Sequence, residues 1–274
     1  MVGVGMIGGS IALAAKSCGA AKSVIGIGRA AQRLEQAHRC GIIDEGFVDL
    51  AAGVRRAELV VFCTPVDRIA AGVREAAGSC QNGALITDAG SVKACIANEL
   101  ASGLPRGVEF VGSHPLAGSE QQGFQHADGR LFENKMCVVT PLATSSRVAV
   151  DRIAAFWEAL GSKVVEMSPE AHDAALAETS HLPHLTAAAL AATLSSENRP
   201  LAASGFRDTT RIASGDPDLW TAIFLGNRDS VLASLTKYDG LLAEFRRAIE
   251  HGDARRLQEL LAAAKANREG NGLQ

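Results

Sequence analysis

The first 165 residues alternate short β-branched apolar runs with alanine-rich stretches of helical character. Helical segments such as residues 10–17 and 67–77 separate the apolar runs. Strand, helix and strand in turn predict a Rossmann-type, doubly wound parallel sheet with helices on both faces. The strands are expected at residues 24–27, 59–63, 84–87, 110–112, 137–140 and 163–166.

After residue 166 the strand pattern stops and helical signals follow. Ser168-Pro169-Glu170 combines an N-cap residue, a proline at the first helical position and an acid in the first turn. Asp216-Pro217 repeats the cap and the proline. Apolar residues then recur at steps of three and four, which predicts one buried helical face. These residues are Val231, Leu235, Tyr238, Leu242, Phe245 and Ile249, with Leu257, Leu260, Leu261 and Ala264 in a last helix.

The change of pattern predicts an α/β domain over residues 1–166 and an all-helical second domain over residues 167–274. No flexible spacer separates them, so a ligand cleft between the two domains is expected. The alanine-rich faces and apolar stripes of the helical part favour a homodimer interface. Internal packing alone is the alternative.

Composition narrows the class of protein further. Apolar residues make up 47% and charged residues 21% of the 274 residues, which is typical of an ordered globular chain. No apolar run is long enough to span a bilayer, and no basic segment precedes the start, so neither a membrane span nor an ordinary signal peptide is expected. The net charge of −3, with no long basic run, disfavours nucleic acid as a partner.

Six cysteines occur without any CxxC pair. A disulfide framework is typical of small secreted domains, which this chain does not resemble in size or start. Buried, reduced cysteines in a cytoplasmic protein are therefore expected.

Gly3-Val4-Gly5-Met6-Ile7-Gly8 matches the G-x-G-x-x-G pattern and opens a helical segment. Such glycines let the backbone approach a pyrophosphate, whose charge then lies at the helix N-terminus. A tight strand-to-helix turn without a ligand is the alternative. Only Met1 and Val2 precede the motif, whereas a first strand needs about five residues. Either the true start lies upstream or the first strand is clipped.

The end of the second predicted strand bears on the choice of dinucleotide. An acid about 20 residues past the glycines usually binds the ribose 2′-hydroxyl of NAD. Position 28 is glycine, Arg29 follows, and Arg33 lies one turn further on. An arginine can pair with a 2′-phosphate, so NADP is favoured over NAD, which stays possible.

Polar segments follow three strands, at the edge where α/β sheets bind ligands. They are Cys63-Thr64-Pro65, TDAGSVK at residues 87–93 and GSHPLAGSE at residues 112–120. With GMIGGS at the start, ETSHLPH at 178–184 and GFRDTTRIASGDPDLW at 205–220, the chain resembles the prephenate/arogenate dehydrogenase family of tyrosine biosynthesis. The resemblance covers nearly the whole chain, in order.

The resemblance implies an NAD(P)-dependent oxidative decarboxylation of prephenate to 4-hydroxyphenylpyruvate. By similarity, His114 accepts the proton of the C4 hydroxyl, and Ser91 orients His114 or that hydroxyl. A neutral imidazole with a pKa near 6.5 suits this role at neutral pH. Arg211 matches the family's carboxylate-binding arginine, and Arg207 falls where the family also has a basic residue. We expect Arg211 to hold the side-chain carboxylate, because pairing with the departing carboxylate would stabilise the ground state.

The resemblance also places His181 and His184 at the substrate cleft, with Pro183 expected to kink their helix. A metal held by this histidine pair is the alternative, but the sequence places no third ligand, so no metal is expected. Glu120 would gate the pocket or sense the ring carboxylate. His38, His126, His172 and His251 receive no role and are expected at the surface. The residues expected at the cofactor are Gly3, Gly5, Met6, Ile7, Gly8, Arg29, Thr64 and Pro65.

Other functions stay open on the sequence alone. Arogenate is an alternative substrate. A β-hydroxyacid-type dehydrogenase would rely on a catalytic lysine, for which Lys93 is the candidate. A dinucleotide sensor without turnover is the non-enzymatic alternative.

Overall fold

The structure is a computed structural model that describes residues 1–118 and 121–270. Glu120, expected to gate the substrate pocket, lies outside the described residues. By spatial contacts the chain divides into two units, Met1–Arg228 and Asp229–Gln274. The first unit therefore contains the sheet and also the first helices of the all-helical part of the sequence.

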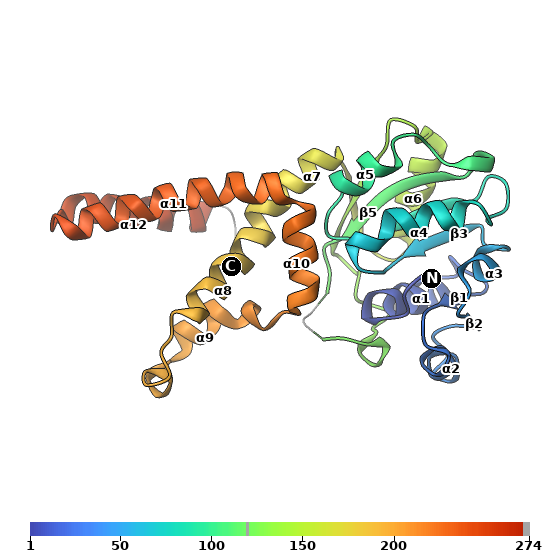
Figure 1. Cartoon of the computed structure of the whole chain (residues 1–274), viewed down its shortest axis with the longest axis horizontal. Coiled ribbons are helices and arrows are strands. Elements are labelled where there is room, and N and C mark those ends of the chain that lie inside the picture. The colour runs from blue at the N-terminus through green and yellow to red at the C-terminus, as the bar shows by residue number, and fades with distance from the viewer. Residues whose placement is uncertain (119–120, 271–274) are drawn as a thin grey trace. The chain divides into compact units, whose positions relative to one another are not determined.

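The sheet of the first unit is assembled from two parts (Figure 1). Val2 joins them. β1 pairs with β2, and the other strands lie in the order β3-β4-β5-β6-β7. Val2 bridges Ile27 on one side and Phe62 on the other, both in parallel. The strands are β1 (Ile25–Ile27), β2 (Glu45–Phe47), β3 (Leu59–Phe62), β4 (Leu85–Asp88), β5 (Glu109–Pro115), β6 (Met136–Pro141) and β7 (Lys163–Glu166).

Helices cover both faces of this sheet, because successive side chains of a strand point to opposite faces. On β3, Val60 and Phe62 pack with α4 (Ile69–Ala77) and α5 (Ala94–Leu100), whereas Val61 packs with α1 (Met6–Ser17) and α6 (Arg147–Ala159). The helices α2 (Ala31–Arg39) and α3 (Leu50–Val54) flank β1 and β2. The apolar run at residues 59–63 predicted a strand that is buried on both sides, and β3 is that strand.

The sheet differs from the prediction in three respects. β2 was not predicted, because Glu45-Gly46-Phe47 is too short and polar to stand out. β5 and β6 pair antiparallel, so the sheet is not wholly parallel. β5 also extends beyond the predicted residues 110–112 to Pro115, which places His114 inside a strand rather than after one.

The chain beyond β7 is helical throughout the described residues, as the pattern predicted. Ser168 caps α7 (Pro169–Leu176) by accepting from the Ala171 amide at 3.1 Å, and Asp216 caps α10 (Pro217–Gly226) by accepting from the Leu219 amide at 3.0 Å. Between them lie a π-helical turn at Ala177–His181, α8 (Leu182–Ala192) and α9 (Ser204–Thr210). The irregularity expected around Pro183 is this π-helical turn, which ends just before α8.

The last two helices are α11 (Arg228–Glu250) and α12 (Ala254–Gly270), which together make up the second unit from Asp229 onward. Both helices fall where the spacing of apolar residues predicted them. Large apolar side chains on these helices are exposed, including Leu241 and Ile249 of α11 and Leu261 of α12. Among the described residues, no helix is long and apolar enough to cross a membrane.

All six cysteines are free thiols, in agreement with the prediction. Cys80 and Cys137 are buried, and Cys63 and Cys95 are partly buried. Cys18 and Cys40 are exposed, so the expectation that the cysteines are buried is wrong for these two.

Candidate active site

The Gly-rich segment between Val2 and α1 turns so tightly that two positions require glycine. Gly3 has a φ of +95°, and a Cβ there would lie 2.6 Å from the carbonyl oxygen of Cys63. A Cβ on Gly8 would lie 2.1 Å from the carbonyl oxygen of Gly3. Around Gly5, by contrast, the described residues leave open space where a Cβ would stand. The backbone is therefore accessible at Gly5.

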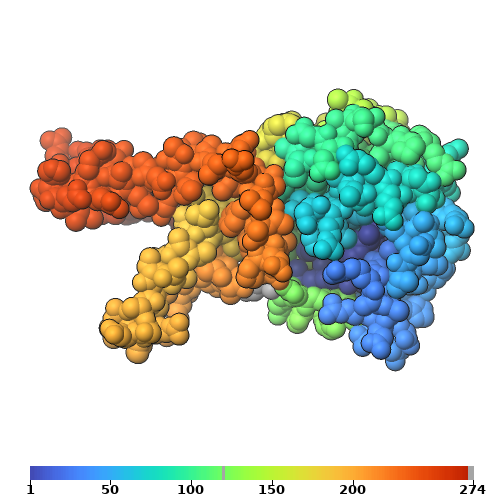
Figure 2. Space-filling model, viewed as in Figure 1, coloured from blue at the N-terminus to red at the C-terminus, as the bar shows by residue number. Residues whose placement is uncertain are grey.

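The start of α1 suits an anionic group. Gly5 is the N-cap residue and supplies no side chain to cap the helix, and no acid occurs in the first turn, which begins with Met6 and Ile7. The amide groups of this turn and the positive end of the helix dipole attract anions. In the space-filling view, the dark-blue start of the chain forms the floor of a hollow (Figure 2). This arrangement can take a pyrophosphate.

Thr64 and Pro65 follow β3 beside the Gly-rich turn. The Thr64 amide nitrogen lies 3.3 Å from the position of a Cβ built on Gly3. The Thr64 hydroxyl is buried and has no hydrogen-bond partner among the described residues. Because a buried polar atom is normally satisfied, this hydroxyl fits a ligand that supplies the missing partner.

At the end of β1, Gly28 stands where an acid would bind a ribose hydroxyl. Arg29 and Arg33 are both exposed beyond it. Exposed cationic side chains therefore follow the end of β1.

The strand backbone at His114 is fixed by the hydrogen bonds of the preceding residue, Ser113. The Ser113 hydroxyl lies 2.5 Å from the carbonyl oxygen of Asp88 and accepts from the Trp157 indole nitrogen at 2.9 Å. The Ser113 amide donates to the Asp88 carboxylate at 3.1 Å, and its hydroxyl also lies 2.8 Å from that of Thr87. The backbone that carries His114 is thus tied to β4 and α6.

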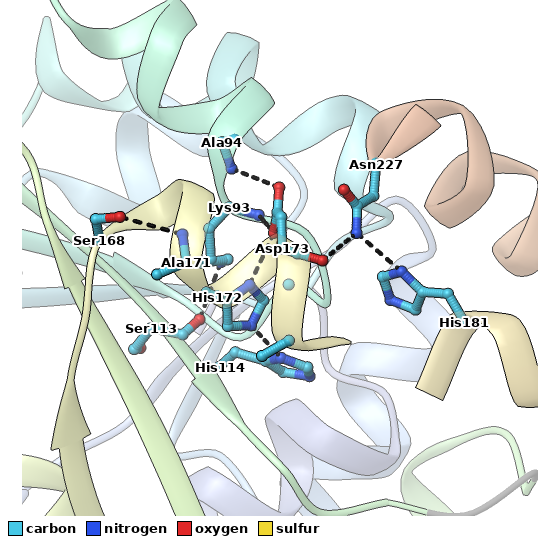
Figure 3. Close-up of polar contacts among 12 residues, drawn as sticks. Lys93, Ala94, Ser113, His114, Ser168, Ala171, His172, Asp173, His181 and Asn227 are labelled. Atoms are coloured by element: carbon cyan, nitrogen blue, oxygen red, sulfur yellow. Dashed lines mark hydrogen bonds and ion pairs between the residues drawn. The ribbon is translucent and has the colours of Figure 1, made fainter. Parts of the chain in front are cut away.

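A hydrogen-bonded chain runs from the His114 ring into α7 (Figure 3). Nδ1 of His114 lies 2.8 Å from Nε2 of His172, and Nδ1 of His172 lies 2.7 Å from Oδ1 of Asp173. The Asp173 carboxylate also accepts from the backbone amides of Lys93 at 2.8 Å and Ala94 at 2.9 Å. These amides fix the carboxylate at the start of α5.

The order of donors in this chain follows from the carboxylate. Asp173 is acceptor-only when ionised, so Nδ1 of His172 carries a proton. In neutral His172, Nε2 is then an acceptor, and Nδ1 of His114 must donate to it. This tautomer leaves Nε2 of His114 with a free lone pair, which is the nitrogen a proton acceptor needs.

The surroundings favour the neutral form of His114. Burial lowers the pKa of His114 well below its usual value, and His172, Lys93 and His181 lower it further. The imidazole is therefore uncharged at neutral pH and able to accept a proton.

A buried ion pair supports the same strand ends. Lys93 Nζ contacts the Asp88 carboxylate, with side-chain exposures of 1% and 0%, and donates to the carbonyl oxygen of Ser113 at 3.0 Å. Asp88 also accepts from the Gly90 amide at 2.9 Å. Lys93 is thus committed to holding β4 and β5 together, which argues against the catalytic lysine of a β-hydroxyacid-type dehydrogenase.

His181, at the end of the π-helical turn, lies on the other side of Asp173. The Asn227 amide nitrogen lies 3.0 Å from Nδ1 of His181 and donates to the Asp173 carbonyl oxygen at 2.7 Å. Nε2 of His181 is buried and has no hydrogen-bond partner among the described residues. Burial lowers the pKa of His181 to about 4, so it too is neutral at pH 7. A π-turn at such a position is common at functional sites.

His184 stacks on Trp220, with ring centroids 3.4 Å apart and planes inclined by 22°. His181 meets the same indole edge-on at 6.2 Å. Burial and, to a lesser degree, the charge of Arg211 lower the pKa of His184 to about 4. Arg211 is exposed and begins the 3-10 turn Arg211–Ser214, which packs against α8, the helix that carries His184. Contacts therefore connect His114 to His184 through His172, Asp173, Asn227, His181 and Trp220.

The segment that follows His114 lies over the Gly-rich turn. A Cβ on Gly118 would be 3.6 Å from the side chain of Ile7 and 3.7 Å from that of Met6. The histidine strand and the start of α1 are thus brought to one edge of the sheet, as the doubly wound arrangement requires.

The remaining predicted residues lie in the same unit. Ser91 lies in the loop between β4 and α5, while the ring partner of His114 in the structure is His172. Arg207 is exposed on α9, and its Nε donates to the Ala202 carbonyl oxygen at 3.2 Å. Among the described residues, no three His, Cys, Asp or Glu side chains are grouped to hold a metal.

His172 was expected at the surface, and this prediction is wrong: His172 is fully buried against His114. Asp173 and Asn227 were not predicted as site residues. The adjacent pair His172-Asp173 in the first turns of α7 was the available signal, since a buried histidine needs a partner for each ring nitrogen. Asn227 carried no signal, because it follows α10 as an ordinary polar residue after a helix.

A Rossmann-type sheet with an anion-binding turn beside a neutral, oriented histidine defines the class of dinucleotide-dependent oxidoreductases. The family model described as "Prephenate dehydrogenase, nucleotide-binding domain" matches residues 11–166, and that described as "Prephenate dehydrogenase, dimerization domain" matches residues 168–263. The chain belongs to the prephenate dehydrogenase family, as the motifs predicted.

Individual relatives agree with this assignment. The chain is 37% identical to a prephenate dehydrogenase of Bacillus subtilis, over 98% of this chain and 75% of the relative. It is 34% identical to a cyclohexadienyl dehydrogenase of Zymomonas mobilis, over 94% and 90% of the two chains. A solved prephenate dehydrogenase of A. aeolicus, in complex with hydroxyphenyl propionate and NAD+, superposes with a TM-score of 0.91 at 31% identity, over 98% and 96%. The predicted fold class, family and enzymatic function are confirmed by these matches.

Proposed function

We propose that the chain oxidatively decarboxylates prephenate to 4-hydroxyphenylpyruvate, with His114 as the proton acceptor. The observation that carries this assignment is the chain from Asp173 through His172 to Nδ1 of His114, which leaves Nε2 of His114 as a base. A positioned base of this kind contributes about 10²- to 10⁴-fold to the rate.

The reaction asks little more of the protein than orientation and proton transfer. The nicotinamide, when bound, supplies the acceptor for the hydride that leaves C4. Nε2 of His114 accepts the C4 hydroxyl proton as C4 is oxidised, and loss of carbon dioxide from C1 sends its bonding electrons into the ring. His114 then returns the proton to the phenolate oxygen. Aromatisation of the ring makes the overall change favourable.

The substrate's charges require cations, and Arg211 is our candidate for the side-chain carboxylate. Its charge acts on His184, which is stacked on Trp220. A partly desolvated Arg–carboxylate pair is a strong, directional contact. Arg207 contributes a second cation from α9, and His181 offers from the buried side its Nε2, which has no hydrogen-bond partner among the described residues. Ser91 would orient the C4 hydroxyl or His114.

The Gly-rich turn, the start of α1 and the Thr64 hydroxyl, which has no partner in the described part of the chain, fit the pyrophosphate of a nicotinamide dinucleotide. Gly3, Gly5, Met6, Ile7 and Gly8 would hold it. Pro65 would border it after β3. For the choice of dinucleotide we propose NADP over NAD, because Gly28 and the exposed Arg29 replace the usual acid.

Replacing Arg29 by alanine tests this choice. The KM for NADP should rise about 10-fold or more, since a charge-assisted hydrogen bond is worth about 1.5 to 3 kcal/mol. The KM for NAD should stay within twofold. Equal effects on both cofactors, or a wild-type preference for NAD, would contradict the proposal.

Arogenate is the second candidate substrate. The chain is 31% identical to a solved arogenate dehydrogenase of Synechocystis, which superposes with a TM-score of 0.83. Its sequence identity to the A. aeolicus prephenate dehydrogenase is also 31%. Steady-state kinetics with prephenate and arogenate, each with NAD and NADP, decides between them by kcat/KM. The His114→Asn variant is the control, and its kcat should fall about 10²- to 10⁴-fold with the preferred pair.

We further propose that residues 1–166 and 167–274 act as the dinucleotide-binding and the substrate and dimerisation domains, and that the chain forms homodimers through the latter. The exposed apolar side chains of α11 and α12 support this, and the free cysteines support a cytoplasmic location. Sedimentation should give a dimer, and Leu241→Glu together with Ile249→Glu should shift it to monomer.

A further inference from the structure

The side chain of Asn227 makes two hydrogen bonds in the interior of the first unit (Figure 3). Its amide nitrogen lies 2.7 Å from the Asp173 carbonyl oxygen and 3.0 Å from Nδ1 of His181. A backbone carbonyl group can only accept, so the part of the amide that faces it is the NH2 group and not the oxygen. The orientation of the Asn227 amide is thus fixed by Asp173, and its second N–H points to His181.

This orientation sets the tautomer of His181. Nδ1 of His181 must accept from the Asn227 amide, so in the neutral ring the proton lies on Nε2. Burial lowers the pKa of His181 to about 4, which keeps the ring neutral at pH 7. His181 is 1% exposed, and its Nε2 has no hydrogen-bond partner among the described residues. A buried N–H group of this kind is unfavourable unless a ligand supplies an acceptor.

His114 and His181 are held in opposite tautomers through one residue, Asp173. The Asp173 carboxylate acts through His172 and leaves Nε2 of His114 with a lone pair. The Asp173 carbonyl group acts through Asn227 and leaves Nε2 of His181 with a proton. The site therefore offers one acceptor and one donor, each on a neutral imidazole.

Prephenate carries groups that match this pair of imidazoles. Its C4 hydroxyl gives up a proton, which His114 accepts in the proposed reaction. Across the ring, C1 carries a carboxylate, which can only accept hydrogen bonds and which loses its charge when carbon dioxide departs. A cation held against this carboxylate would stabilise the charged ground state and slow its departure. A neutral donor such as His181 orients the same carboxylate with less stabilisation of the ground state.

We propose that Nε2–H of His181 binds the ring carboxylate of the substrate, and that Asn227 is the positioning residue that keeps the proton on this nitrogen. The assignment rests on the proposed decarboxylation of prephenate. Arg211 then serves the side-chain carboxylate, and His181 serves the departing one. The oxygens of carbon dioxide are uncharged and accept more weakly than a carboxylate, so the contact with His181 is lost as the bond from C1 breaks.

The tautomer of His181 can be measured in the intact chain without any substrate. In a nitrogen NMR spectrum of the histidine-labelled protein at pH 7, His181 should show a protonated Nε2 and an unprotonated Nδ1. Its signals are assigned by their loss in His181→Phe. In Asn227→Leu the two tautomers should mix, because no donor then faces Nδ1. The signals of the exposed His38 are the control and should stay the same. A wild-type spectrum with the proton on Nδ1 would overturn the proposal.

Kinetics with prephenate and with its product identifies the group that His181 binds. His181→Phe keeps a ring but removes the donor, and it should raise the KM for prephenate about 10-fold or more, with a smaller change in kcat. The product 4-hydroxyphenylpyruvate lacks the ring carboxylate, so its inhibition constant is the matched control and should stay within about twofold, as should the KM for the dinucleotide. An equal rise in the inhibition constant, a rise confined to the dinucleotide, or a fall in kcat at unchanged KM would each overturn the assignment.

A double-variant cycle separates positioning by Asn227 from its packing. Asn227→Leu should raise the KM for prephenate in the wild type but not in His181→Phe, because Asn227 acts only through His181. His181→Gln, whose amide is a donor without tautomers, should recover part of the affinity that His181→Phe loses. A rise of the same size in both backgrounds would overturn the role of Asn227. If the wild type did not turn over prephenate, the proposed function itself would fail, and the nitrogen spectrum would still decide whether Asn227 sets the tautomer.

Discussion

Nδ1 of His114 and Nε2 of His172 lie 2.8 Å apart, and this contact fixes which nitrogen of His114 can act as a base. His172 is itself fixed by Asp173, whose carboxylate is held by two backbone amides at the start of α5. The proton acceptor on β5 is thus positioned from α7, which follows the sheet in the sequence. Residues on both sides of the change in pattern near residue 166 therefore build one site.

Replacing His172 by alanine removes the hydrogen bond that orients His114 and tests its importance. We expect kcat with prephenate to fall about 10- to 100-fold, while KM changes little, because the base is misoriented rather than lost. His172→Gln should recover part of the rate, since its amide oxygen can accept from Nδ1 of His114. His251→Ala, at an exposed position on the second unit, is the control and should leave kcat unchanged. A large rise in KM with constant kcat would assign His172 to substrate binding instead.

The sequence was sufficient for the described strands other than β2, for the helix caps and for the Gly-rich turn, because each depends on local residue types. The apolar run before Cys63 and the cap at Ser168 are examples. The role of His172 could not be predicted in this way, since it depends on α7 docking against the end of β5, 58 positions earlier in the chain. The pairing of β5 with β6 was missed for the same reason: strand direction is set by the chain's path and not by its apolar pattern.

Acidification should destabilise the fold through its buried histidines. Burial depresses the pKa of His181 to about 4, below the value near 6.5 expected in the unfolded chain. As the pH falls, the unfolded state therefore binds the proton first. The contribution of neutral His181 to the free energy of unfolding is complete above pH 6.5 and is lost as pH falls toward 4. For His181, which is 1% exposed, the loss is at most about 3 kcal/mol, at 1.36 kcal/mol per pH unit.

Urea unfolding at pH 7 and pH 5 measures this effect. We expect the free energy of unfolding to be lower at pH 5, and the difference between the two pH values to be smaller in His181→Gln. The exposed His251→Gln variant should keep the wild-type difference. If His181→Gln showed the full wild-type pH dependence, His181 would not be the group that titrates.

Arg211 should act mainly in substrate binding. Its replacement by alanine should raise the KM for prephenate by about 10- to 100-fold, as expected for loss of a charge-assisted pair, with a smaller effect on kcat. Arg211→Lys should recover part of the affinity, because the charge remains while the bidentate geometry is lost. The KM for the dinucleotide is the internal control and should stay constant. A collapse of kcat at unchanged KM would refute this role.

The buried ion pair of Lys93 and Asp88 should stabilise the fold and take no part in the proton transfer at His114. Variants that remove the pair test this distinction. Lys93→Met leaves the Asp88 carboxylate buried without its cation, which should cost about 3 to 5 kcal/mol of stability. Adding Asp88→Asn removes the remaining charge, so the double variant should be more stable than Lys93→Met alone. Urea unfolding of the two single variants and the double variant gives the coupling.

Because Lys93 Nζ is 1% exposed and is engaged by Asp88 and Ser113, the folded double variant should retain measurable turnover. A Lys93→Met variant that folds as stably as the wild type but loses all turnover would instead identify Lys93 as the proton-transfer group and favour a β-hydroxyacid-type mechanism.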